Sequence, residues 1–68
     1  MHRSISFDVY LERENTLIMF RSNDPQVWLW FTQNTKAQRL GNGFAVGQAY
    51  APAIVSALQE EGFTVGME

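Results

Sequence analysis

The sequence contains no cysteine among its 68 residues. No disulfide can therefore supplement the core, and no thiolate can bind a metal ion or act as a nucleophile. This absence favours a reducing compartment, so we expect a cytoplasmic protein. The sequence also lacks the apolar run of a signal peptide and the ~20 consecutive apolar residues that would span a membrane. We therefore expect a soluble protein without a membrane partner.

Basic side chains are missing from the second half of the chain. Residues 40–68 contain three acidic side chains and no basic one, whereas residues 1–39 contain five basic and four acidic side chains. The net charge is −2. An acidic surface repels phosphate backbones and attracts basic proteins. The charge distribution therefore disfavours nucleic acid and favours a partner with a basic surface.

No set of residues with the spacing of a catalytic or metal site is present. His2 is the only histidine and stands next to the chain start, and no base accompanies the serine and threonine hydroxyls. The glycines of residues 41–47 are not followed by the Lys-Ser/Thr pair of a phosphate-binding loop. Paired carboxylates such as Glu12 and Glu14 lack the cleft that would keep one of them protonated. We expect no enzymatic activity, no bound metal and no cofactor.

The composition is 46% hydrophobic and 18% charged, which is typical of a folded globular protein. A chain of this length makes one domain, residues 1–68, with a small core.

Apolar residues alternate with polar ones along the first half of the chain. This period of two predicts strands over residues 4–11, 16–21 and 27–32, with turns between them. The third of these strands, with the sequence VWLWFT, contains both tryptophans. Residues 36–41 and 44–47 are predicted as two further strands joined by a turn at Asn42-Gly43.

The period then changes to that of a helix. Ala51, Ile54, Val55 and Leu58 recur at helical spacing, and Pro52 and Gly62 suit the first turn and the residue after the end. These signals predict one helix over about residues 51–61, followed by a short closing strand over residues 63–67. The expected fold is α+β, an antiparallel meander of four to six strands with this helix packed on one face.

Strand pairing divides the side chains of the sheet into two faces. If the first turn places Leu11 opposite Thr16, alternate residues of the first three strands share one face. The more apolar face holds Ile5, Phe7, Val9, Leu11, Ile18, Phe20, Val27, Leu29 and Phe31. We expect the helix to dock on this face.

The opposite face is predicted to carry a patch of large side chains, namely Tyr10, Leu17, Met19, Arg21, Trp28 and Trp30. Three interpretations of the patch stay open. The strands of residues 36–47 could cover it as a second small core. It could be a protein interface, where Trp, Tyr, Met and Arg are enriched. It could also be a stacking platform for single-stranded nucleic acid, although the acidic charge disfavours this.

Two acidic residues break a rule of helix stability. Glu60 and Glu61 fall in the last helical turn, where the negative end of the macrodipole favours basic side chains. Either they form a solvated end, or they form with Glu68 an acidic patch for a basic partner.

In size, charge and lack of cysteine the chain resembles the small inhibitors that phages and mobile elements encode against host machinery, including anti-CRISPR proteins. No motif carries this likeness. We therefore expect a non-enzymatic, stoichiometric module that binds a larger protein or protein complex with a basic surface. A nucleic-acid-binding sheet and a homo-oligomeric structural protein, the simplest case being a homodimer, are the alternatives. The predicted partner-binding residues are Trp28, Trp30, Tyr10, Met19, Arg21, Glu60, Glu61 and Glu68.

Overall fold

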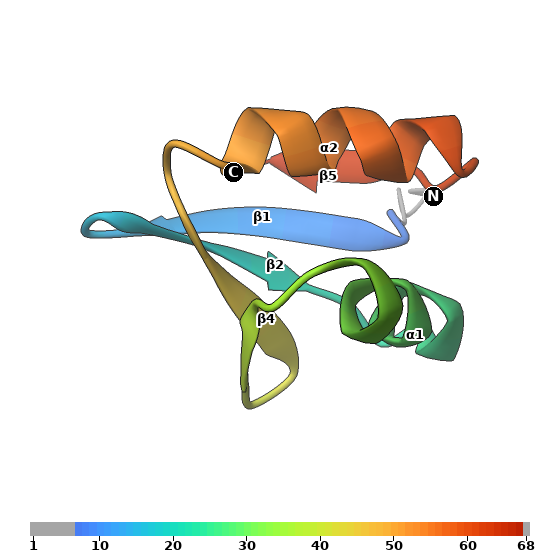
Figure 1. Ribbon diagram of the computed structural model, residues 1–68, viewed down its shortest axis with the longest axis horizontal. Helices are drawn as coiled ribbons and strands as arrows, with labels where there is room; N and C mark the ends of the chain where they lie inside the picture. The colour runs from blue at the N-terminus through green and yellow to red at the C-terminus, as the bar shows by residue number, and fades with distance from the viewer. Residues whose placement is uncertain (1–6, 68) are drawn as a thin grey trace, which may run out of the picture.

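The computed structural model describes residues 7–67. Its elements follow one another in the order β1 (Val9–Glu14), β2 (Leu17–Arg21), α1 (Pro25–Asn34), β3 (Gln38–Leu40), β4 (Gly43–Gly47), α2 (Ala51–Glu60) and β5 (Val65–Met67). The α+β class is confirmed, although the described residues form two helices where the sequence predicted one (Figure 1).

The strands form one five-stranded sheet in the order β3-β4-β2-β1-β5. Three of the four strand pairs are antiparallel, as predicted, and β5 pairs with β1 in parallel. The sheet is therefore mixed and is not a simple meander. The parallel pairing follows from the connection, because α2 crosses from β4 over the sheet and returns the chain to the far edge.

The first hairpin has a tighter turn than the predicted one. Asn15 adopts a positive φ of 58°, which asparagine tolerates, so the chain reverses over two residues. Leu11 consequently lies opposite Phe20 rather than Thr16, a shift of four residues in the register. An even shift keeps every side chain on its predicted face. The predicted register is wrong, but the division of β1 and β2 into two faces holds.

The segment VWLWFT is not a strand but the middle of helix α1, so the prediction of a strand over residues 27–32 is wrong. Asp24 caps the helix, because its side chain accepts a hydrogen bond from the backbone N–H of Gln26 at 2.9 Å. Pro25 occupies the first helical turn, where its missing N–H costs nothing. Val27 and Phe31, four residues apart, form the buried face of the helix.

Helix α2 and the closing strand β5 confirm the predictions for residues 51–61 and 63–67. After the last helical residue, Gly62 takes a φ of 98°, and Phe63 donates its N–H to the carbonyl of Leu58 at 3.1 Å. This is the glycine-terminated helix end that the sequence indicated.

The second hairpin consists of β3 and β4, and its two-residue turn is Gly41-Asn42 rather than the predicted Asn42-Gly43. Gly43 is instead the first residue of β4. A Cβ at Gly43 would lie 2.8 Å from the carbonyl oxygen of Phe20, so only glycine fits at this close contact between β4 and β2.

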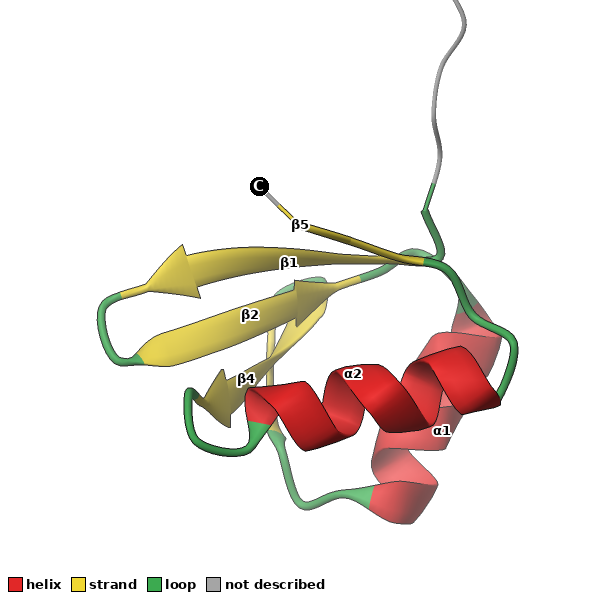
Figure 2. Ribbon diagram, turned by 90° about the horizontal axis from the view of Figure 1, so that it is seen from above, coloured by secondary structure: helices red, strands yellow, loops and turns green. Residues whose placement is uncertain are grey.

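Both helices lie on the same side of the sheet, as Figure 2 shows. We call the side they cover the inner face. The core consists of Val9, Leu11, Phe20, Phe44 and Val46 from the sheet, Val27 and Phe31 from α1, and Ala51 and Leu58 from α2. Phe31 is its centre, because its ring stacks on Phe44 at 4.6 Å between centroids and is tilted to Phe20 at 5.5 Å.

Three predicted members of the inner face are not found in the core. Leu29 belongs to α1 and is 51% exposed, so the prediction for it is wrong. Ile5 lies outside the described residues. Phe7 precedes β1 and is 45% exposed, and its ring lies directly against Gly66, where a Cβ would overlap it. The N-terminal strand therefore begins later than predicted, at Val9.

Candidate functional site

The opposite side of the sheet is covered by neither helix, and we call it the outer face (Figure 2). The strand registers place the following residues on it: Tyr10, Glu12 and Glu14 from β1, Leu17, Met19 and Arg21 from β2, Gln38 and Leu40 from β3, Gly43, Ala45 and Gly47 from β4, and Gly66 from β5. The described helices leave this face of the sheet uncovered.

Apolar side chains are exposed across this outer face. Leu17 and Leu40 are 40% and 43% exposed, and Tyr10 is 36% exposed. Met19, between Glu12 and Ala45 in the register, is only 4% exposed although no helix covers it, so side chains of its own face must shield it. The outer face therefore has a filled centre with exposed apolar side chains around it.

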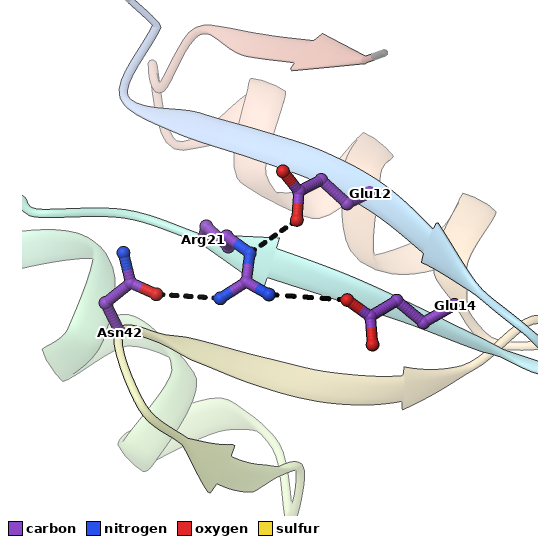
Figure 3. A network of polar contacts seen from close by, with 4 residues as sticks. All are labelled: Glu12, Glu14, Arg21 and Asn42. Atoms are coloured by element: carbon purple, nitrogen blue, oxygen red, sulfur yellow. Dashed lines mark hydrogen bonds and ion pairs between the residues drawn. The ribbon is translucent and has the colours of Figure 1, made fainter.

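An ionic network lies on the same face and is anchored on Arg21 (Figure 3). The Arg21 Nε donates to Glu12 Oε1 at 2.6 Å, and its Nη2 approaches Glu14 Oε2 at 3.4 Å. The Arg21 Nη1 donates to Asn42 Oδ1 at 2.8 Å, which connects the network to the turn between β3 and β4. One guanidinium is thus held by three side chains from β1 and from this turn.

The network leaves this part of the outer face negative. The hydrogen bond that Arg21 donates to Glu12, together with the charges of Glu12 and Glu14, raises the pKa of Arg21 above its usual range. The guanidinium therefore stays protonated, and two carboxylates face one cation. Among residues 7–67, each glutamate uses one oxygen for Arg21, and the second oxygen forms no hydrogen bond. The side chains of Glu12 and Glu14 are 33% and 57% exposed, so these oxygens are open to a further cation.

Tyr10, Met19 and Arg21, all three predicted as partner-binding residues, share the outer face, together with Leu17. Trp28 and Trp30 do not, because they belong to helix α1 on the inner side of the sheet. The predicted aromatic patch is therefore divided between the two sides of the molecule.

Trp28 is half-buried and contacts three neighbouring residues of the described chain. Its Nε1 donates to the carbonyl of Ser22 at 2.7 Å, its ring meets Phe44 edge-on at 6.0 Å, and the Arg39 guanidinium lies 4.2 Å from the ring centroid. Trp30 meets Phe31 edge-on at 5.2 Å. Both tryptophans are half-buried against the core, so the structure assigns them to packing.

The predicted acidic patch is also separate from the outer face. Glu60 ends α2 and Glu61 follows it, and both are exposed on the helical side of the sheet. Glu68 lies outside the described residues. The acidic groups that do lie beside the exposed apolar side chains are Glu12 and Glu14, which sequence reasoning assigned to a turn. No local pattern indicated a strand here, because Glu12, Arg13 and Glu14 form a run of charged residues without apolar alternation.

Other kinds of site find little support in the part of the chain that the structure describes. No three His, Cys, Asp or Glu side chains among residues 7–67 lie close enough together to hold a metal ion. No helix in the same range is long and apolar enough to cross a membrane. Comparison with models of protein families, with curated proteins and with solved structures found no match.

Proposed function

We propose that the protein is a non-enzymatic, stoichiometric protein-binding module that uses the outer face of its sheet. Its partner is a larger protein or protein complex with a basic surface. The proposal extends to a cytoplasmic inhibitor of the kind that phages and mobile elements direct against host complexes, for which size and acidic charge are the grounds.

One observation carries the proposal. Both helices pack on the inner face, and the five strands leave the outer face bare with Tyr10, Leu17 and Leu40 exposed on it. Apolar side chains gathered on one surface and bordered by charge are characteristic of interaction sites. A partner that covered them would remove this apolar area from water, which is the main favourable term in association.

The chemistry of the partner follows from the Arg21 network. Glu12 and Glu14 outnumber Arg21 and keep carboxylate oxygens open toward solvent. A lysine or arginine of the partner can share these oxygens while its neighbours contact Leu17 and Tyr10. Such a charge at the rim guides the encounter, and the apolar contacts slow dissociation.

Single-stranded nucleic acid fits the same surface less well. The stacking platform required Trp28 and Trp30 on the sheet, but both belong to α1. Among the described residues, the aromatic side chains of the outer face are Tyr10 and, at the Cβ position of Gly66, Phe7. Phosphates would also approach Glu12 and Glu14. A second copy of the chain is disfavoured because two such acidic faces would repel each other.

The test is affinity capture from lysate of the source organism with matched baits, followed by mass spectrometry. The baits are the wild-type protein, a Tyr10→Thr/Leu17→Thr variant, a Glu12→Gln/Glu14→Gln variant and a Glu60→Gln/Glu61→Gln variant. The last is the control, because it removes the same charge from the opposite side of the molecule. Circular dichroism confirms that each bait is folded.

The proposal predicts a protein that wild type and the Glu60/Glu61 variant retain and that the outer-face variants lose. Retention by every bait except the Glu60/Glu61 variant would move the site to the end of α2. Capture of oligonucleotide would favour the nucleic-acid-binding alternative. Self-association that the Tyr10/Leu17 variant loses would favour the homo-oligomeric alternative.

A further inference from the structure

A groove of about 630 Å³ lies at the β3 edge of the sheet, between the link from α1 to β3 and the start of α2. One wall is the segment from Asn34 to Gln38, which links α1 to β3, and the other wall is the first turn of α2 with Tyr50. Ala45, Val46 and Gly47 of β4 form the floor. Its volume is in the range of sites that bind ligands.

The floor of the groove is an open strand edge. The ladder between β3 and β4 stops at the pair Gln38 and Ala45, so the described residues provide no strand partner for Val46 and Gly47 on this side. An extended segment of another chain can continue the ladder here, taking the path that β3 would follow if it were longer. The site therefore suits an extended peptide.

The charge of this region is the reverse of that on the outer face. Residues 25–59 contain no aspartate or glutamate, and their only charged side chains are Lys36 and Arg39. Lys36 lines the groove and is exposed. Arg39 follows in β3, and its guanidinium lies over the Trp28 ring, 4.2 Å from the ring centroid. Neither cation forms an ion pair within residues 7–67. The field at the groove favours an acidic occupant.

We propose that this groove binds an extended acidic segment of a partner protein by strand addition at the edge of β4. Apolar side chains of the segment contact Val46, Ala53 and Ile54, and its carboxylates face Lys36. The segment lies against Tyr50, which forms one side of the groove. Tyr50 is 70% exposed, and its ring lies 3.5 Å from the position that a Cβ would take at Gly47.

The groove adjoins the outer face, because Gln38, Ala45 and Gly47 belong to both and Gly47 pairs with Leu17. The two surfaces differ in charge: Glu12 and Glu14 lie on the outer face, whereas Lys36 lines the groove. The same molecule can therefore hold a basic surface on its outer face and an acidic segment at its β3 edge.

The test uses three synthetic peptides of equal length in which valine alternates with glutamate, with lysine or with serine. Binding is followed by fluorescence polarisation of the labelled peptide, and the site is mapped from amide shifts in ¹H–¹⁵N spectra of the protein. We expect the valine–glutamate peptide to shift amides of the groove residues, including Gly47 and Ala53. Binding of the valine–lysine peptide should instead shift amides near Glu12 and Glu14 and so test the outer-face proposal. Failure of either proposal can therefore be distinguished from failure of the other.

Two variants with the same change in charge isolate the role of Lys36. Lys36→Gln should weaken binding of the valine–glutamate peptide by roughly threefold to fivefold, since a single exposed ion pair contributes modestly. Arg13→Gln, on the first hairpin, should leave the affinity within about twofold, because only the net charge changes. Ala53→Phe places a large side chain in the groove and should abolish binding of the peptide without changing the charge of the protein. The ¹H–¹⁵N spectrum of each variant shows whether it is folded.

Three results would overturn the proposal. The serine peptide could bind as tightly as the glutamate peptide, which would remove the acidic requirement. The glutamate peptide could fail to bind, or could shift residues outside the groove. The free protein could instead show concentration-dependent shifts at the groove with dimers in sedimentation, which would assign the groove to a second copy.

Discussion

The two faces of the sheet differ in what they contribute. On the inner face Val9, Phe20 and Phe44 are at most 5% exposed beneath two helices. On the outer face Leu17 and Leu40 are 40% and 43% exposed, and a network of charged side chains replaces a second layer. The described part of the chain therefore gathers its buried apolar side chains in one layer and leaves the other face of the sheet uncovered.

Chain length explains the asymmetry. Small domains bury a limited fraction of their surface, and residues 7–67 provide two ten-residue helices to cover a five-stranded sheet. Both helices are needed on one face to enclose Phe31 and Leu58, which are 1% and 0% exposed. Substitutions on the inner face should therefore change stability, and substitutions on the outer face should change binding.

The largest effect is expected for Phe31→Ala. The substitution removes the ring that stacks on Phe44 and is tilted to Phe20, which should cost about 3–5 kcal/mol. A domain of this size has a total free energy of unfolding of roughly 3–10 kcal/mol, so this loss is a large part of its stability. Urea denaturation measures the loss, and a cooperative transition shows that the variant is folded. Phe31→Leu retains most of the volume and serves as the matched variant that should stay folded. A loss below about 1 kcal/mol for Phe31→Ala would show that the inner face is not the core.

Trp30→Ala should have the next largest effect. The ring is half-buried and edge-on to Phe31, so we expect about half the loss of a fully buried tryptophan, roughly 1.5–3 kcal/mol. A loss of ~2 kcal/mol corresponds to a decrease in Tm of roughly 8–16 °C in thermal denaturation. Unchanged stability together with lost partner binding would instead make Trp30 a surface anchor and contradict its assignment to packing.

Trp28→Phe should have a smaller effect. It removes the hydrogen bond from Nε1 to Ser22 and weakens the contact with Arg39, which together should cost about 1–2 kcal/mol. Arg39→Gln removes only the cation–π contact and should cost about 0.5–1 kcal/mol. Equal losses for the two variants in chemical denaturation would mean that the indole hydrogen bond contributes nothing.

The elements with two independent sequence signals were predicted correctly, whereas VWLWFT was not. Helix α2 combines helical spacing with Pro52 and Gly62, which mark both of its ends. A short apolar run such as Val27–Phe31 fits a strand and a helix equally well by its pattern. The signal that decides between them is Asp24-Pro25, an N-cap followed by a first-turn proline, which was interpreted as a turn.

The site was predictable in part for a related reason. Alternation placed Tyr10, Met19 and Arg21 on one face, and the even shift in register preserved that placement. Glu12 and Glu14 were assigned to a turn because a run of charged residues is typical of one. They belong to β1, because its pairing with β2 continues as far as Glu14 and Leu17, and Arg21 of β2 contacts both carboxylates. Such contacts between strands are not contained in any local pattern.

The most direct test of the contrast between the two faces is a paired measurement on Tyr10→Thr/Leu17→Thr. Threonine suits a strand, and both side chains are partly exposed, so the free energy of unfolding should fall by less than about 1 kcal/mol for each substitution. Titration with the valine–lysine peptide should at the same time show binding to wild type and none to the variant. A variant that unfolds readily, or that binds the peptide as wild type does, would contradict the assignment of the outer face to binding.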